Sequence, residues 1–201
     1  MNSKYEITDI AHERYPWLHC IRAKVDIGEN VKPGDLGGYL ESESNLSFEP
    51  GDDAWLFGES VCCGEACVHK DAVLRDNAVV KDRAYVSHGA VISGSGIVED
   101  DAIVRGALVA EFARVSGNGM LIQSADMGYR PEAIGRAAIY GQVIGNYLLA
   151  GDTVVVPGEE FHNNCKDRIW LYDNKRTVQR EVSRDELRPR PSQKKQRDHV
   201  R

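Results

Sequence analysis

The feature of this chain that most constrains its fold is a six-residue repeat across residues 53–105. A small residue returns at every sixth position, and an aliphatic residue or cysteine follows it two places later, through nine consecutive repeats. Internal repetition of this regularity is the sequence signature of a solenoid. The small positions are Ala54, Ser60, Ala66, Ala72, Ala78, Ala84, Ala90, Gly96 and Ala102, and their companions are Leu56, Cys62, Val68, Leu74, Val80, Val86, Ile92, Val98 and Val104.

A period of six matches neither an α-helix nor a single long strand. It fits a short strand followed by a turn, because residues two apart on a strand point to the same side. Three such strands would close one triangular coil of about 18 residues, with the small and aliphatic side chains inside. The triplets between strands, such as RDN at 75–77, are rich in the residues that tight corners require. We therefore expect an all-β, parallel β-helix of roughly five to six coils.

The repeat resembles that of the hexapeptide-repeat, left-handed parallel β-helix proteins. The stretch VKPGDLGGYLESESNLSFEPGDDAWLFGES (31–60) resembles the start of the YdcK-like β-solenoid proteins, which open with a similar Val-Lys-x-Gly-x-x-Gly-Gly-aromatic sequence. The resemblance implies a left-handed parallel β-helix and a homotrimer. It does not carry an activity, because the function attached to the YdcK-like group is that of acyltransferases that share the fold.

The repeat divides the chain into four parts. Residues 1–50 are an N-terminal segment with the first coil, and residues 51–158 are the β-helix, in which 123–134 (QSADMGYRPEAI) lacks the hexad and is expected to form a loop. Residues 159–188 are expected to form a C-terminal cap, with a hairpin turning at Asp173-Asn174 and a short helix opening at 183–186. Residues 189–201 form a basic tail that we expect to be disordered.

The residue between each inward pair should face outward, and all nine of these residues are apolar or aromatic. Contiguous apolar surface is typical of a contact surface, although the preference of branched residues for strands offers a second explanation. We expect these residues to form the interface of a homo-oligomer, a trimer by the resemblance. Sorted by every third repeat, they form three columns: Trp55, Val73 and Val91; Val61, Val79 and Ile97; Cys67, Tyr85 and Ile103.

Charge is distributed unevenly. Residues 175–201 carry ten Lys or Arg against four Asp or Glu, which gives this segment a net charge of +6. Because the net charge of the whole chain is −6, the other 174 residues carry a net charge of −12. An acidic body would repel a phosphate backbone, so we expect no nucleic-acid binding beyond weak contacts of the tail. No apolar run approaches the ~20 residues that span a membrane, so we expect no membrane association. Five cysteines without framework spacing indicate reduced thiols and hence a cytoplasmic protein.

Three of the six histidines are candidates for a catalytic base. In the acyltransferases that the fold resembles, a histidine at a subunit boundary takes a proton from a hydroxyl or amine, a step suited to the pKa of imidazole. His69 and His88 lie at corners almost one coil apart, and His162 follows the last coil beside Glu159 and Glu160. An exposed corner or cap histidine is the simpler explanation for each. Acetyl-CoA would be a cofactor only under this hypothesis, and otherwise none is required.

No metal site is expected. Cys62, Cys63 and Cys67 resemble a ligand cluster in sequence, but the repeat places Cys62 inside the coil, Cys63 at a corner and Cys67 outside. Three thiols that point in different directions cannot converge on one tetrahedral zinc ion.

The other class of function is a non-catalytic binding protein. A trimeric β-helix offers flat walls and inter-subunit grooves to a protein or a small molecule, and the cap adds the residue types that anchor contacts: Trp170, Tyr172, Arg176 and Arg180. Packing of the two aromatic residues on the last coil is the alternative. Because the histidines do not assemble into an active site, we expect an oligomeric binding or scaffold protein. A coenzyme A-dependent acetyltransferase is the alternative, so whether the protein is an enzyme stays open.

Overall fold

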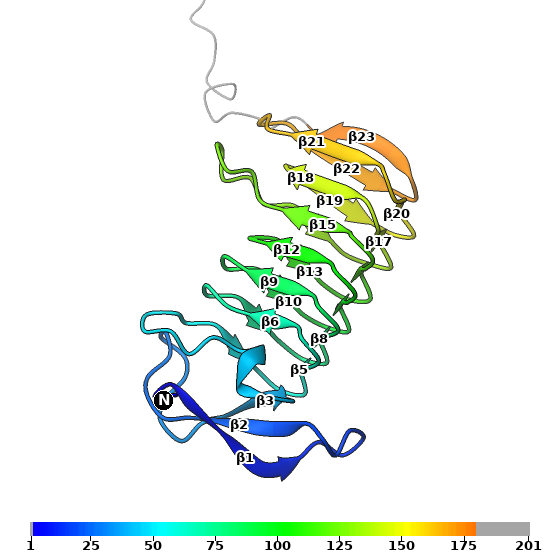
Figure 1. Ribbon diagram of the computed structural model, residues 1–201. Coiled ribbons are helices and arrows are strands. Elements are labelled where there is room, and N and C mark those ends of the chain that lie inside the picture. Colours follow the sequence, from blue (N-terminus) through cyan, green and yellow to red (C-terminus); the bar gives the residue numbers. More distant parts are fainter. Residues whose placement is uncertain (1, 180–201) are drawn as a thin grey trace, which may run out of the picture.

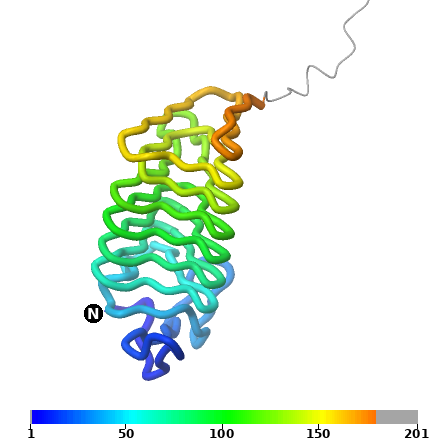
Figure 2. The backbone as a smooth tube through the Cα atoms, turned by 90° about the vertical axis from the view of Figure 1, so that its right-hand side faces the viewer, coloured from blue at the N-terminus to red at the C-terminus, as the bar shows by residue number. Residues whose placement is uncertain are grey.

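The chain folds into a parallel β-solenoid, seen in a computed structural model that describes residues 2–179. Short strands follow one another around a triangular coil, and the coils stack into a column with one hairpin at each end (Figures 1 and 2). The expected all-β, parallel architecture is confirmed, with about seven turns rather than five to six. Within the described residues, the only helix is the single 3₁₀ turn η1 (Glu43–Asn45).

Three sheets form the faces of the column. In spatial order, the first sheet contains β1 (Tyr5–Ala11), β2 (His19–Ala23), β3 (Leu36–Leu40), β5 (Val61–Cys62), β8 (Val79–Val80), β11 (Ile97–Val98), β14 (Arg114–Val115), β17 (Ala138–Ile139) and β20 (Val154–Val155). The second contains β4 (Trp55–Leu56), β7 (Val73–Leu74), β10 (Val91–Ile92), β13 (Leu108–Val109), β16 (Glu132–Ala133), β19 (Tyr147–Ala150), β22 (Arg168–Tyr172) and β23 (Lys175–Gln179). The third contains β6 (Cys67–Val68), β9 (Tyr85–Ser87), β12 (Ile103–Arg105), β15 (Met120–Ile122), β18 (Gln142–Gly145) and β21 (Glu160–Asn163).

The interior of the column consists of the two inward positions of each repeat. The alanines at the small positions and all nine companions, from Leu56 to Val104, are fully buried. Burying one such aliphatic side chain stabilises the fold by about 1.5–3 kcal/mol. The strands also pair in the expected register, with Val73 beside Val91 and Tyr85 beside Ile103. Small and aliphatic residues two apart therefore form one continuous core.

Acidic residues at the corners hold successive coils together. Asp76, Asp82 and Asp100 have φ values of 59°, 63° and 60°, in the left-handed region that Asp tolerates better than most residues. Their carboxylates accept the backbone N–H of the next corner, from Gly94, Asp100 and Gly117 respectively. These acidic residues are structural, because they satisfy donors that the turns leave unpaired.

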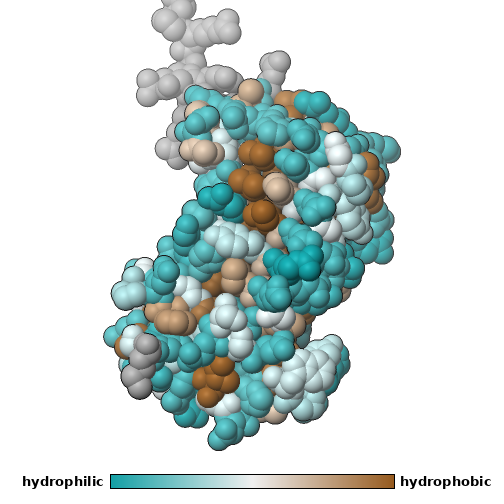
Figure 3. All heavy atoms as spheres, in the orientation of Figure 1, coloured by the Kyte–Doolittle hydropathy of each residue, from teal (hydrophilic) through white to brown (hydrophobic). Residues whose placement is uncertain are grey.

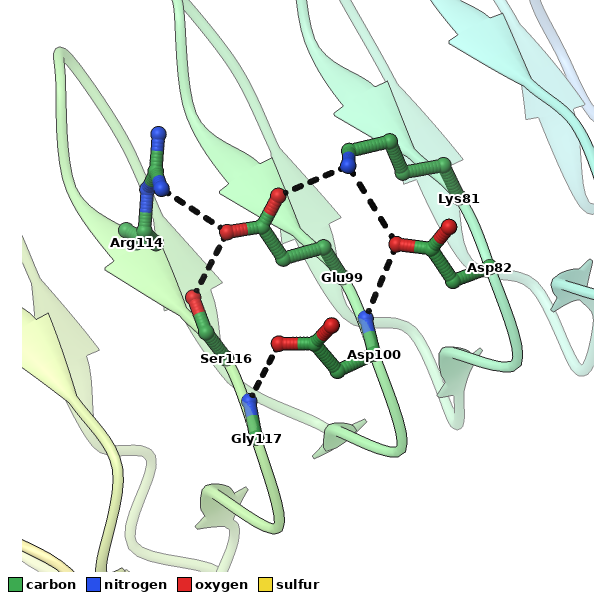
Figure 4. Close-up of polar contacts among 7 residues, drawn as sticks. All are labelled: Lys81, Asp82, Glu99, Asp100, Arg114, Ser116 and Gly117. Carbon is green, nitrogen blue, oxygen red and sulfur yellow. Dashed lines mark hydrogen bonds and ion pairs between the residues drawn. The ribbon is translucent and has the colours of Figure 1, made fainter.

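Glu99 connects three coils at one of these corners (Figure 4). Its carboxylate lies 2.9 Å from Lys81 Nζ, 2.8 Å from Arg114 Nη1 and 3.0 Å from Ser116 Oγ. Burial would raise the pKa of this carboxyl, but hydrogen bonds from Lys81 and Ser116 and the charge of Arg114 outweigh burial and lower it. The network ties β8, β11 and β14 together, and both carboxylate oxygens have partners from this chain.

The sheets continue after the repeat loses its period. Register partners along the second sheet are 18 residues apart in the regular region, and then 17, 24, 16 and 22 apart. The longest insertion is the connection from β15 to β16, which spans residues 123–131, so the expected loop is present but its last residues form β16. The number of hexads underestimates the number of coils, because the strands continue to pair where the corners between them change length. The partners after the regular region are Val91, Leu108, Glu132, Leu148 and Trp170.

The C-terminal segment expected as a separate cap is largely part of the solenoid. Beyond residue 158, β21 and β22 complete the last turn by pairing in parallel with β18 and β19. Only β23 leaves the parallel stack, folding back on β22 through the expected turn at Asp173 and Asn174, where φ is 49° and 61°. The expected helix at 183–186 and the tail at 189–201 lie outside the described residues.

The N-terminal segment covers the first members of two apolar columns. Strands β1 to β3 extend the first sheet, and Trp55 is 1% exposed, with its ring 6.3 Å from that of Tyr5. Val61 is 4% exposed. The prediction that Trp55 and Val61 line an interface with another chain is therefore wrong, because their own chain already buries them. The other seven column residues are half-buried on the outer faces: Val73, Val91, Val79, Ile97, Cys67, Tyr85 and Ile103.

Candidate functional site

The structure places two of the three candidate histidines at the same corner of the column. His69 and His88 follow β6 and β9 at the corner between the third and second sheets, in consecutive coils. The Gly89 N–H donates to the Lys70 carbonyl across this corner. His162 is exposed in β21, in the last coil. The corner pair and His162 therefore belong to different parts of the column.

His88 is held on both sides of its ring. Its Nδ1 lies 2.8 Å from Ser87 Oγ, and its Nε2 lies 3.2 Å from a guanidinium nitrogen of Arg105 in the next coil. Because a guanidinium can only donate, Nε2 accepts and Nδ1 carries the proton. Burial, followed by the positive charges of Arg105 and Lys70, lowers the pKa of His88. The ring is thus a neutral imidazole at pH 7.

His88 and Arg105 form one side of a surface groove of about 420 Å³. The other side is Gln123, Ser124 and the first residues of the long connection. The Gln123 amide donates to the Gly128 carbonyl at 2.6 Å, which closes the connection into a compact loop. The groove therefore presents imidazole, guanidinium and amide groups within one concave surface.

Two side chains brace this loop against the column. The Ser124 hydroxyl donates to Asn164 Oδ1 at 2.9 Å, and Arg130 donates to the carbonyls of Gly89 and Ala107 at 3.5 and 3.1 Å. Arg130 thereby connects its own coil to the two preceding coils. A loop tied at both ends to the corner keeps the groove in one shape.

Arg105 gives the groove a positive charge although the described body is acidic. Its guanidinium forms no ion pair with a carboxylate of the described chain. Other corner arginines are neutralised: Arg83 and Arg136 each make two hydrogen bonds to an aspartate one coil away. An unpaired guanidinium in a groove is suited to a carboxylate or a phosphate, which it binds through two parallel hydrogen bonds.

His69 lies at the edge of a second depression of about 360 Å³, with Phe48 and Tyr85. Its ring stands edge-on to Tyr85 at 4.5 Å between centroids, and its buried Nε2 has no partner in the described chain. Burial lowers the pKa of His69, while the charge of Asp52 opposes that shift. His69 is a packed corner residue and does not reach the groove around His88.

The residues expected to anchor a partner lie at the C-terminal end of the second sheet. Trp170 and Tyr172 are 39% and 58% exposed on β22, and Arg176 pairs with Leu171 from β23. Arg180 lies outside the described residues. The two aromatic rings therefore keep much of their surface in solvent and do not simply pack the cap onto the last coil.

The cysteines are distributed as the repeat predicted. Cys62 is buried inside the coil, and Cys63 and Cys67 are half-buried at a corner and on an outer face. All five cysteines are free, and the described residues contain no group of three side chains able to hold a metal ion.

Sequence reasoning missed Arg105, Gln123 and Ser124 as site residues. The spacing of these residues could have indicated the site, because Arg105 follows His88 by about one coil length. Gln123 follows Arg105 by one further coil length. The step from His88 to Arg105 is 17 residues rather than 18, so the rigid hexad register did not bring the two together.

The fold and the groove define a class: a parallel β-solenoid with a basic corner groove. No protein-family model matches the chain, and no curated protein is similar enough in sequence to count as a relative. In the part of the chain that the structure describes, no helix has the length and apolar character to cross a membrane.

Proposed function

We propose that this protein is a β-solenoid binding protein whose corner groove takes a small molecule through a carboxylate or phosphate group. The observation that carries this proposal is the guanidinium of Arg105, which faces a concave surface without a carboxylate partner. Arg105 would form charge-assisted hydrogen bonds to the anion, each stronger than a neutral one. Gln123, whose amide has a second N–H beside the one donated to Gly128, would contribute a neutral hydrogen bond from the opposite side.

We also infer that the chain is a hexapeptide-repeat, left-handed β-helix protein of the YdcK-like type. The N-terminal segment supports this inference, since its Gly37-Gly38 pair packs where no side chain fits. A Cβ on Gly37 would lie 2.7 Å from the Trp55 ring, and one on Gly38 would overlap the Ser60 carbonyl oxygen. The glycine pair is thus needed to start the column. The five free cysteines support a reducing compartment, and we place the protein in the cytoplasm.

We propose further that the protein is a homotrimer. The outer face of the third sheet carries a row of half-buried apolar side chains, and Figure 3 shows apolar surface along this face of the column. A second copy would remove that surface from water, at about 25 cal/mol per Å² of apolar area. The residues of this row are Tyr85, Ile103, Met120, Ile122 and Ile144.

Native mass spectrometry tests the trimer. We expect a trimer for the natural sequence and a shift to monomer for Ile103→Glu, which places a charge in the row. Phe112→Glu is the matched control, because Phe112 is 70% exposed at a corner and should leave the trimer intact. A monomer for the natural sequence at every concentration would overturn the proposal.

An acetyltransferase is the second candidate, favoured by the position of His88 beside the long loop. In that reaction, Nε2 would take the proton of the acceptor hydroxyl or amine as the acceptor atom bonds to the acyl carbon. The proton would then pass to the sulfur of coenzyme A as the thioester bond breaks. Arg105 counts against this role, since it occupies the Nε2 lone pair and lowers the pKa of the imidazole.

One set of variants tests binding and separates the two candidates. Inorganic phosphate, citrate and acetyl-CoA are titrated, with thermal unfolding and native mass spectrometry as readouts. We expect Arg105→Gln to weaken binding by about tenfold, the loss of one charge-assisted hydrogen bond. Arg136→Gln removes an equal charge from a neutralised corner and should have no effect. Equal binding by both variants would refute the groove, and thiol release from acetyl-CoA that His88→Ala abolishes would establish the enzyme.

A further inference from the structure

A row of aromatic rings lies at the N-terminal end of the column, where the hairpin between β1 and β2 contacts β3. The His12 ring is 4.7 Å from Tyr39 and 5.1 Å from Tyr15, and Tyr15 is 5.5 Å from Trp17. Tyr15 and Trp17 are 43% and 57% exposed. Leu18 is buried at 1% exposure and anchors the tip. Tyr and Trp are enriched at contact surfaces, because each joins a large apolar ring to a polar group.

The hairpin tip overhangs the outer face of the first sheet and leaves a groove of about 360 Å³. His12 and Tyr15 line the side formed by the tip. Val61 and Val79, consecutive outward residues of the first sheet, line the side formed by the column. The groove therefore has aromatic rings facing an apolar floor, an arrangement that excludes water from a bound alkyl group.

Two carboxylates, Glu13 and Glu59, also line this groove. Neither forms an ion pair with a cation of the described chain, and Arg14, on the same rim, forms none either. Burial and then the negative charge of Glu59, with a smaller contribution from Glu13, raise the pKa of Tyr39. With two carboxylates against the one guanidinium of Arg14, the lining of the groove carries a net negative charge.

The backbone of the hairpin tip holds the His12 ring in place. The ring Nδ1 accepts the backbone N–H of Arg14 at 3.0 Å and of Tyr15 at 3.3 Å. These two hydrogen bonds fix the orientation of the imidazole beside Tyr15. The face of the Tyr15 ring attracts a cation electrostatically.

We propose that this groove binds an organic cation, an alkylated ammonium group that sits between the rings of His12 and Tyr15 and the carboxylates of Glu13 and Glu59. Ring faces attract the cation, the carboxylates neutralise it, and the half-buried Val79 packs against its alkyl groups. A bare metal ion does not fit, because the described chain offers no set of three ligands. An anion would meet two unpaired carboxylates. The site is independent of the basic corner groove, which lies at the corner between the other two sheets.

Choline and its uncharged isostere 3,3-dimethylbutan-1-ol are the probes, since they share shape and differ in charge. The indole N–H resonance of Trp17, next to the rings, reports binding by NMR. We expect choline to shift this resonance in a saturable manner and the isostere to shift it little or not at all. Equal affinity for both would mean a purely apolar groove, and no saturable shift with choline would mean no site; either result overturns the proposal.

Two variants and a control locate the site. Glu59→Gln removes one charge without changing shape, and Tyr15→Leu removes a ring from an exposed position; each should weaken choline binding about fivefold, the value of one cation–π contact or one partly desolvated ion pair. Glu65→Gln, at an exposed corner outside the groove, is the matched control and should bind as the natural sequence does. Unchanged affinity in Glu59→Gln and Tyr15→Leu would also overturn the assignment. Unchanged thermal unfolding would show that any loss is local.

Discussion

Arg105 donates a hydrogen bond to Nε2 of His88 at 3.2 Å, from one coil of the solenoid to the next. This contact fixes the tautomer of the imidazole and directs its Nδ1–H to Ser87. It also places a guanidinium on one side of the groove that the long loop borders. The pair therefore decides whether this corner works as a base or as an anion-binding site.

Removing Arg105 should raise the pKa of His88. The positive charge of Arg105 is the second cause, after burial, of the lowered pKa of this imidazole, so Arg105→Gln removes one of the two main contributions. The proton resonances of the His88 ring, followed by NMR through a pH titration, measure the change. Arg83→Gln, which removes an exposed guanidinium at another corner, should leave the His88 titration where it is. A His88 pKa that does not move in Arg105→Gln would contradict the assigned contact.

Glu99 should be a larger source of stability than exposed corner pairs. Glu99→Gln removes the charge that Lys81 and Arg114 share, and turns an amide donor toward one of them. We expect a loss of about 2 kcal/mol in the free energy of unfolding, measured by urea denaturation. Asp101→Asn at the exposed pair with Arg83 should cost less than about 1 kcal/mol. Equal losses would mean that the partial burial of Glu99 contributes nothing.

Stability should fall in acid through Asp52. Burial would raise the pKa of this carboxyl, but N–H donors from Asp71, Ala54 and Lys70 and the Ser47 hydroxyl lower it to about 2. The folded state thus favours the charged form, so the stabilisation is complete above about pH 4, the unfolded value, and is lost as the pH falls toward 2.

Urea denaturation between pH 5 and about pH 2 measures this dependence for the natural sequence and for Asp52→Asn. The variant should lose about 2 kcal/mol at pH 7 and show a shallower decline in acid. Asp126→Asn, in the exposed loop, should follow the natural sequence. If the free energy of unfolding of Asp52→Asn fell with pH as steeply as that of the natural sequence, other carboxyls would be responsible for the loss of stability in acid.

Gly38→Ala should be strongly destabilising. A Cβ at this position would overlap the Ser60 carbonyl oxygen and crowd the Leu56 side chain, and backbone cannot move aside cheaply. We expect a loss of about 3 kcal/mol, at the upper end of the range for overpacking. Gly51→Ala meets open space at φ +81°, so its cost should be only the left-handed strain of about 1 kcal/mol. Comparable losses for both variants would contradict close packing of the N-terminal segment on the first coils.

The sequence by itself determined the parallel coil, its interior and its register over the regular region. Ala78 and Val80 recur with a strict period, and a strand turns every second side chain inward, so local spacing is enough to assign the inside and the outside. The same spacing placed Val79 beside Ile97 and separated Cys62 from Cys67. Both the direction of each side chain and its neighbour in the next coil follow from the alternation of side chains along a strand and from the regular length of the repeat.

Only the tertiary structure decided the number of turns, the burial of Trp55 and the pairing of Arg105 with His88. Corner lengths change after Val104, and a corner of variable length destroys the sequence period while the sheet hydrogen bonds continue. Trp55 is covered by the N-terminal segment, whose strands are distant in sequence from the repeat. Arg105 is in register with Ser87, and its contact with the neighbouring His88 depends on how the two side chains lie at the corner, which the spacing of residues does not determine.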